Sequence, residues 1–185
     1  DVQLWRRVTQ HVGDVLARRD TARAEAYRSS ADAYAQRLDS LHQYVMRQAK
    51  RIPEDRRVLI TSHDAFRYLG QAYDIEVRGL QGISTASEAG TQDVQTLADF
   101  VVTRRIPALF VESSVSPRGI EAVQAAVKAK GFQVRLGGTL YGDALGDRGT
   151  PTGTYIGALR HNIDTIVQGL LNTSAQSPTA VRQRR

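Results

Sequence analysis

The chain has 185 residues, of which 41% are apolar, and it carries a formal charge of +6 and no cysteine. This length allows one domain with an ordinary buried core and an attached helical piece. The composition excludes disulfides and thiolate metal sites, and no apolar run of about 18 residues could span a membrane. Half of the excess positive charge lies near the chain's end, and no basic stripe with interleaved aromatics occurs, which argues against nucleic-acid binding.

Residues 1–52 are predicted to form a helical segment. Apolar side chains at helical spacing within residues 2–19 predict a first helix with one apolar face: Leu4, Val8, Val12, Val15 and Leu16. A second helix is predicted from Thr21 to about Lys50, with seam residues at intervals of four and three: Tyr27, Ala31, Tyr34, Leu38, Leu41 and Val45. A helix of about thirty residues would span roughly 45 Å. We therefore expect a rigid strut, with a plain helical hairpin as the alternative.

Residues 53–172 alternate between strand and helix patterns and are predicted to form one lobe. The expected strands are 58–61, 75–77, 108–111 and 132–136, and the expected helices are 65–73, 91–104, 117–130 and 154–171. This alternation predicts an α/β fold, with a four-stranded, mainly parallel sheet flanked by helices and preceded by the long helix. The remaining residues, 173–185, are polar and arginine-containing, and we expect a disordered basic tail.

Three ligand-type side chains follow three different predicted strands: His63, Glu112 and Asp143. The carboxyl ends of parallel strands meet at one edge of a sheet, so these side chains are expected to converge. Imidazole and carboxylate together suit a divalent transition metal. Each residue also has a plainer interpretation. His63 could be a hydrogen-bonded structural residue, Glu112 could favour the start of the next helix, and Asp143 could be a turn residue.

Four motifs in this order resemble a known family: T-S-H-D-A-F at 61–66, F-V-E-S-S at 110–114, Y-G-D-A-L-G at 141–146 and T-Y-I-G-A-L-R-H-N-I-D-T-I at 154–166. The family is the TroA-like or ZnuA-like group of zinc- and manganese-specific substrate-binding proteins of bacterial ABC transporters. The resemblance implies two α/β lobes bridged by a long helix, with the metal ion held between them and no catalysis. It also implies a location in the periplasm or on a membrane anchor outside the cytoplasm, and delivery of the ion to a membrane permease.

The resemblance also assigns residues. His63 matches the His or Glu ligand of the family's C-terminal lobe, Asp143 matches its Asp ligand, and Glu112 is expected to orient a ligand without binding the metal. The family's other two ligands are histidines of an N-terminal lobe. This chain would therefore be the C-terminal lobe with its linking helix, and the N-terminal lobe, an export signal and any anchor would lie outside it. Histidine at position 63 favours Zn²⁺, with Mn²⁺ as the alternative.

Two other functions remain open on the residues alone. One is a metal-assisted hydrolase that uses His63, Glu112 and Asp143, although no separate base is evident for activating a metal-bound water. The other is a metal-free interaction domain, in which the helical hairpin pairs with a partner. Turnover of esters and phosphates would indicate the first, and self-association in sedimentation would indicate the second.

Overall fold

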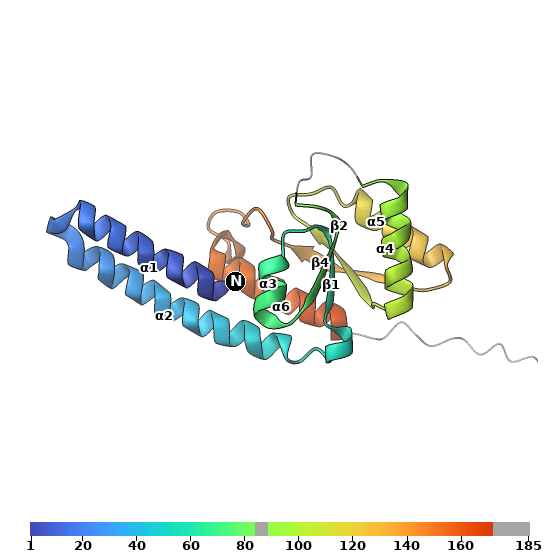
Figure 1. Ribbon diagram of the computed structural model, residues 1–185, viewed down its shortest axis with the longest axis horizontal. Helices are drawn as coiled ribbons and strands as arrows, with labels where there is room; N and C mark the ends of the chain where they lie inside the picture. Colours follow the sequence, from blue (N-terminus) through green and yellow to red (C-terminus); the bar gives the residue numbers. More distant parts are fainter. Residues whose placement is uncertain (84–88, 172–185) are drawn as a thin grey trace, which may run out of the picture.

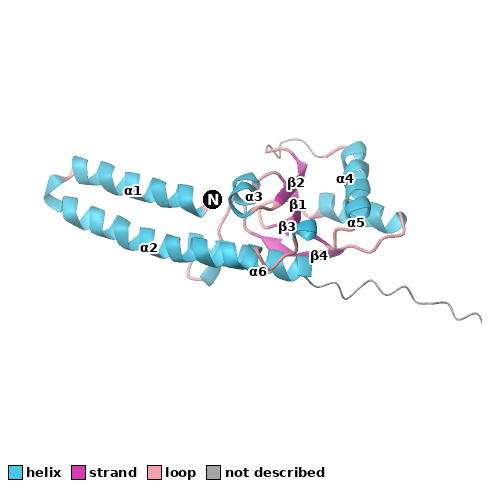
Figure 2. Ribbon diagram, turned by 60° about the horizontal axis from the view of Figure 1, so that its bottom comes forward, coloured by secondary structure: helices cyan, strands magenta, loops and turns pink. Residues whose placement is uncertain are grey.

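The computed structural model describes residues 1–83 and 89–171. The predicted disordered tail at 173–185 lies outside the described residues, as do the polar side chains of the loop at 84–88. The described chain forms a helical hairpin that projects from one side of an α/β body (Figures 1 and 2). None of its described helices combines the length and the apolar character needed to cross a membrane.

The hairpin consists of helix α1 (Val2–Arg19) and helix α2 (Ala24–Ala49), which run antiparallel beside each other (Figure 1). The carboxylate of Asp1 caps α1 by accepting from the amides of Gln3 at 2.7 Å and Leu4 at 3.2 Å. A 3₁₀ turn over Thr21–Arg23 joins the helices, so α2 begins three residues later than predicted. Its 26 residues span about 39 Å.

The two helices approach each other closely at Gly13, where an added Cβ would lie 2.6 Å from the Cβ of Ala31. Only three residues of α1 are buried: Val2, Gly13 and Ala17. The predicted apolar face of α1 is not the face that packs on α2. Four of its five side chains, Leu4, Val8, Val12 and Leu16, are between 41% and 49% exposed, and Trp5 beside them is 43% exposed. This exposed stripe is called the α1 face below.

The C-terminal half of α2 enters the core of the α/β body, as the predicted seam implies. Leu38, Leu41 and Val45 are fully buried there. They pack in one cluster with side chains of helix α3 (Arg67–Tyr73) and helix α6 (Tyr155–Leu171). A hydrogen bond of 2.6 Å from the Tyr44 hydroxyl to Asp164 also links α2 to α6. The hairpin is thus anchored at one end and projects at the other.

Four parallel strands form the centre of the body, so the predicted α/β class is confirmed. Strand β1 (Val58–His63) pairs with β2 (Glu76–Gln81), and β3 (Ala108–Glu112) pairs with β4 (Arg135–Leu140). Strands β1 and β3 lie next to each other, but backbone pairing divides the four strands into two parallel pairs instead of one continuous sheet. At the C-terminal ends of β1 and β3, the His63 amide donates to the side chain of Glu112.

Strand β4 lies at 135–140, later in the chain than the predicted 132–136. Gly137 and Gly138 lie beyond the predicted strand, yet both are residues of β4, opposite a register shift at Leu109 and Phe110. A Cβ at Gly137 would lie 2.5 Å from the Phe110 ring. The glycine is therefore needed for the close approach of an aromatic ring rather than for a turn.

Helices cover both sides of the strands. On the side of the hairpin, α3 and α6 pack around Leu59 and Phe110. On the far side, helix α4 (Thr91–Arg104) and helix α5 (Arg118–Ala129) pack around Ile60 and Leu109 (Figure 1). Short 3₁₀ turns at Glu54–Arg56 and Pro151–Gly153 complete the described elements. All residues of β1 are buried, which fixes its C-terminal end firmly within the body.

Candidate metal-binding site

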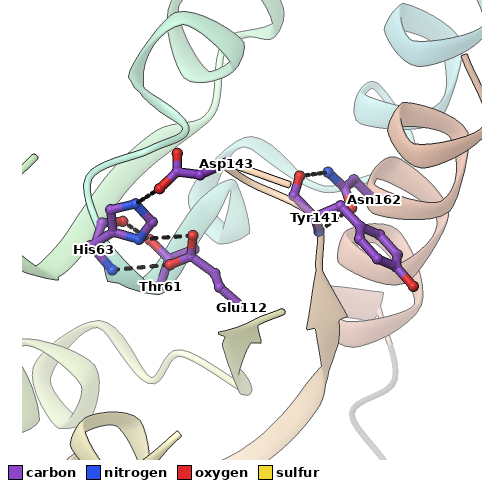
Figure 3. Close-up of polar contacts among 6 residues, drawn as sticks. All are labelled: Thr61, His63, Glu112, Tyr141, Asp143 and Asn162. Carbon is purple, nitrogen blue, oxygen red and sulfur yellow. Dashed lines mark hydrogen bonds and ion pairs between the residues drawn. The ribbon is translucent and has the colours of Figure 1, made fainter. Parts of the chain in front are cut away.

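His63 is the last residue of β1 and is only 1% exposed. Its backbone is held on both sides. The amide donates to Glu112 Oε1 at 3.0 Å, and the carbonyl accepts from the Thr61 hydroxyl at 2.8 Å (Figure 3). These two side-chain hydrogen bonds therefore fix the backbone that carries the imidazole.

Two carboxylates face the two nitrogens of this imidazole (Figure 3). Nδ1 lies 2.9 Å from Glu112 Oε2, and Nε2 lies 2.9 Å from Asp143 Oδ2. The first of these is a close ion-pair contact whose direction departs from that of a good hydrogen bond. The side chain of Glu112 is fully buried, whereas that of Asp143 is 62% exposed. The imidazole thus has one interior and one solvent-facing partner.

The electrostatics of the cluster follow from burial and from these contacts. Burial raises the pKa of the Glu112 carboxyl, and the bonds from His63 offset only part of this effect. Burial alone lowers the pKa of His63 and is its largest single influence. The hydrogen bonds and charges of Glu112 and Asp143 together outweigh it, so the net pKa of His63 is raised. Without a metal ion, the imidazole therefore retains its second proton more strongly than a free histidine does.

The loop that carries Asp143 is held against the rest of the cluster by its two preceding residues. The backbone N–H and C=O of Tyr141 both bond to the side chain of Asn162. Gly142 lies so close to the cluster that an added Cβ would be 2.8 Å from Glu112 Oε2. Gly142 and Asn162 occur in two of the family motifs, but no role was predicted for either residue. A signal was available for Asn162, because it lies beside Leu159, Ile163 and Ile166 on the apolar side of its helix.

The structure confirms that His63, Glu112 and Asp143 converge at one edge of the strands. The other histidines bond elsewhere or are exposed: His42 contacts the Tyr73 hydroxyl, His161 contacts the Thr139 carbonyl, and His11 lies on the exposed surface of α1. Among residues 1–83 and 89–171, no group of three or more His, Cys, Asp or Glu side chains is arranged to hold a metal ion. The assignment of His63 and Asp143 as ligands stays a prediction.

The fold matches that of bacterial metal-binding proteins. A family model described as zinc-uptake complex component A, periplasmic, matches residues 1–169. The zinc-binding protein TroA of Treponema pallidum is 48% identical over 170 residues, which are 92% of this chain and 55% of TroA. The structure of the periplasmic zinc-binding protein TroA superimposes with a TM-score of 0.89, covering 92% of this chain and 61% of that one.

Two further relatives carry names of the same kind. The manganese-binding lipoprotein MntA of Bacillus subtilis is 43% identical over 91% of this chain and 55% of its own length. FimA of Streptococcus parasanguinis, a metal ABC transporter substrate-binding lipoprotein, is 28% identical over 87% of this chain and 50% of its own length.

These matches define the class first: the relatives are named as zinc- and manganese-binding proteins, and one of them as the substrate-binding lipoprotein of a metal ABC transporter. The chain belongs to the zinc-uptake complex component A family, as its sequence motifs suggested. It spans about half the length of the curated relatives that it matches.

Proposed function

We propose that this chain is the C-terminal lobe and linking helix of the substrate-binding component of a metal ABC transporter. It captures Zn²⁺, or alternatively Mn²⁺, outside the cytoplasm and presents the ion to a membrane permease. The observation that carries the proposal is the His63 imidazole held between Glu112 and Asp143 in a chain of this family.

In this proposal, the two carboxylates have different tasks. Glu112 faces Nδ1 and would keep a proton on that nitrogen, so that Nε2, on the side of Asp143, is the nitrogen left for the metal ion. The metal ion takes the place of the proton on Nε2, and the exposed Asp143 carboxylate turns from the imidazole to the ion. An imidazole nitrogen with a carboxylate oxygen suits Zn²⁺ well, while Mn²⁺ favours more oxygen ligands.

The exposed α1 face favours the presence of a second lobe in the whole protein. Large apolar side chains gathered on one water-facing helix indicate a surface that another part of a protein covers. We propose that an N-terminal lobe packs on this face and supplies the remaining ligands, which makes residues 1–52 the helical connection and 53–172 the C-terminal lobe. The protein would act in the periplasm or on a membrane anchor outside the cytoplasm.

Calorimetric titration with Zn²⁺ and with Mn²⁺ tests this function. The 185-residue chain and a protein extended upstream to include the N-terminal lobe are compared. We expect the extended protein to bind one of the ions tightly and the shorter chain to bind weakly, because two ligands on an open site bind a metal poorly.

A pair of histidine variants of the extended protein completes the test. His63→Ala should abolish tight binding, while His42→Ala, which removes an imidazole that contacts the Tyr73 hydroxyl away from the site, should leave binding unchanged. If neither protein binds metal, or if His63→Ala binds as tightly as the parent, the proposed function is wrong and a metal-free interaction domain becomes the better interpretation.

A further inference from the structure

Asn162 is a buried polar side chain that the proposed metal site does not use directly. It lies in α6, is 2% exposed, and is followed by the fully buried Ile163. Its Oδ1 accepts from the Tyr141 amide at 2.9 Å, and its Nδ2 donates to the Tyr141 carbonyl at 2.7 Å (Figure 3). One side chain thus satisfies both backbone groups of a single loop residue.

This pair of bonds lies where the strand pairing stops. Leu140 is the last residue of β4 and pairs with Glu112 at the end of β3. Tyr141 follows directly, and Asn162 holds it as a neighbouring strand would. The neighbouring His161 bonds the Thr139 carbonyl at 2.9 Å, and its ring meets that of Tyr141 edge-on, with centroids 5.3 Å apart. Helix α6 therefore holds the chain up to two residues before Asp143.

Asp143 itself is weakly held. Its side chain is 62% exposed, and its ion-pair partner is His63 Nε2, the nitrogen that a metal ion would occupy. Once His63 binds an ion, that contact no longer fixes the carboxylate. Two residues of extended chain span only about 7 Å, so the anchor at Tyr141 limits where Asp143 can lie.

We propose that Asn162 is a positioning residue for Asp143. By fixing the backbone of Tyr141, it sets the place at which the Asp143 carboxylate meets the metal ion bound to His63. The inference rests on the proposed function for its metal-binding consequence, whereas the fixing of the loop is a property of this chain alone.

The first experiment measures the loop without any metal, in the 185-residue chain. Amide hydrogen exchange is followed in the parent, in Asn162→Ala and in the control Tyr44→Phe, which removes a different hydrogen bond to α6. We expect Asn162→Ala to speed exchange at Tyr141 and in the loop that follows while β1 stays protected, and Tyr44→Phe to leave the loop unchanged. Loop exchange equal to that of the parent in Asn162→Ala overturns the inference.

The second experiment is a double-mutant cycle on Zn²⁺ affinity in the two-lobed protein, with Asn162→Ala, Asp143→Asn and the double variant. Asn162→Ala should weaken binding about 10- to 100-fold, the usual cost of losing a group that orients a ligand. In the Asp143→Asn background, the same change should cost less than about threefold, because the residue that it positions is gone.

The outcomes distinguish the positioning role of Asn162 from the proposed metal-binding function. An equal loss of affinity in both backgrounds would mean that Asn162 acts through general stability, and the positioning role would be wrong. Unchanged affinity in Asn162→Ala would contradict it as well. If the parent binds neither Zn²⁺ nor Mn²⁺, the proposed function fails and the metal-binding role of Asn162 fails with it. The exchange experiment still shows whether Asn162 holds the loop.

Discussion

The two carboxylates beside His63 differ in almost every physical respect. Glu112 is fully buried at the end of β3 and contacts both the amide and the Nδ1 atom of His63. Asp143 is 62% exposed on a loop, where it contacts Nε2. The difference shows how one imidazole can be both fixed and available: the buried partner fixes the ring, and the exposed partner can exchange its contact for an ion.

The largest effect on stability is expected from the buried carboxylate. Glu112→Ala leaves the amide and the Nδ1 atom of His63 without their partner in a closed interior, and breaking a buried pair in this way costs about 3–5 kcal/mol. Urea unfolding followed by circular dichroism measures the loss. A variant as stable as the parent would show that Glu112 does not stabilise this edge of the strands.

A slightly smaller effect is expected from the buried phenol of Tyr73, which packs against α2. Burial raises the pKa of Tyr73 to about 12 in the folded chain. A raised folded-state pKa stabilises the protonated form, so this stability is fully present below the unfolded value near 10 and is lost as pH rises through about 12. Two pH units correspond to about 2–3 kcal/mol.

The unfolding free energy measured between pH 9 and 12 checks this prediction, with Tyr73→Phe as the control. The parent should lose stability across this range, and the control should lose less. Parallel curves for both proteins would contradict the assignment of the loss to Tyr73.

A substitution at Gly142 can separate the loop of Asp143 from the buried Glu112. An alanine there would bring its Cβ to within 2.8 Å of Glu112 Oε2 and 3.3 Å of the Ala65 Cβ, so the loop must move away. We expect a loss of about 1–3 kcal/mol in stability and weaker Zn²⁺ binding in the two-lobed protein. Gly82→Ala is the matched control, because its Cβ would meet nothing within 4 Å.

The smallest effect on stability belongs to the exposed carboxylate. Asp143→Asn removes a charge that is largely in water, and exposed ion pairs contribute about 0–1 kcal/mol. The same variant should strongly weaken Zn²⁺ binding in the two-lobed protein. The contrast with Glu112→Ala would disappear if Asp143→Asn unfolded at a much lower urea concentration than the parent.

The sequence predicted an element or a site well where a single local pattern determines it. The bounds of α4 follow from its apolar periodicity, and the three polar residues of the site converge because parallel strands end at one edge. The predicted strand ends before the glycines of β4, because a sequence does not show that the Phe110 ring lies against Gly137. The α1 face points to solvent because the opposite side of α1, with the small residues Gly13 and Ala17, packs on α2. The apolar pattern alone does not predict this choice. The place of Asn162 on the apolar side of its helix marks it as a buried polar residue, but its partner is a backbone, which no residue pattern identifies.

A zinc-loaded crystal structure of the two-lobed protein, with the ion located by its anomalous scattering, is the most direct test of the metal site. We expect one strong peak about 2.0–2.2 Å from both His63 Nε2 and an Asp143 carboxylate oxygen, with Glu112 still at Nδ1. A zinc ion bound elsewhere, with His63 and Asp143 still in contact with each other, would contradict the roles assigned to both residues.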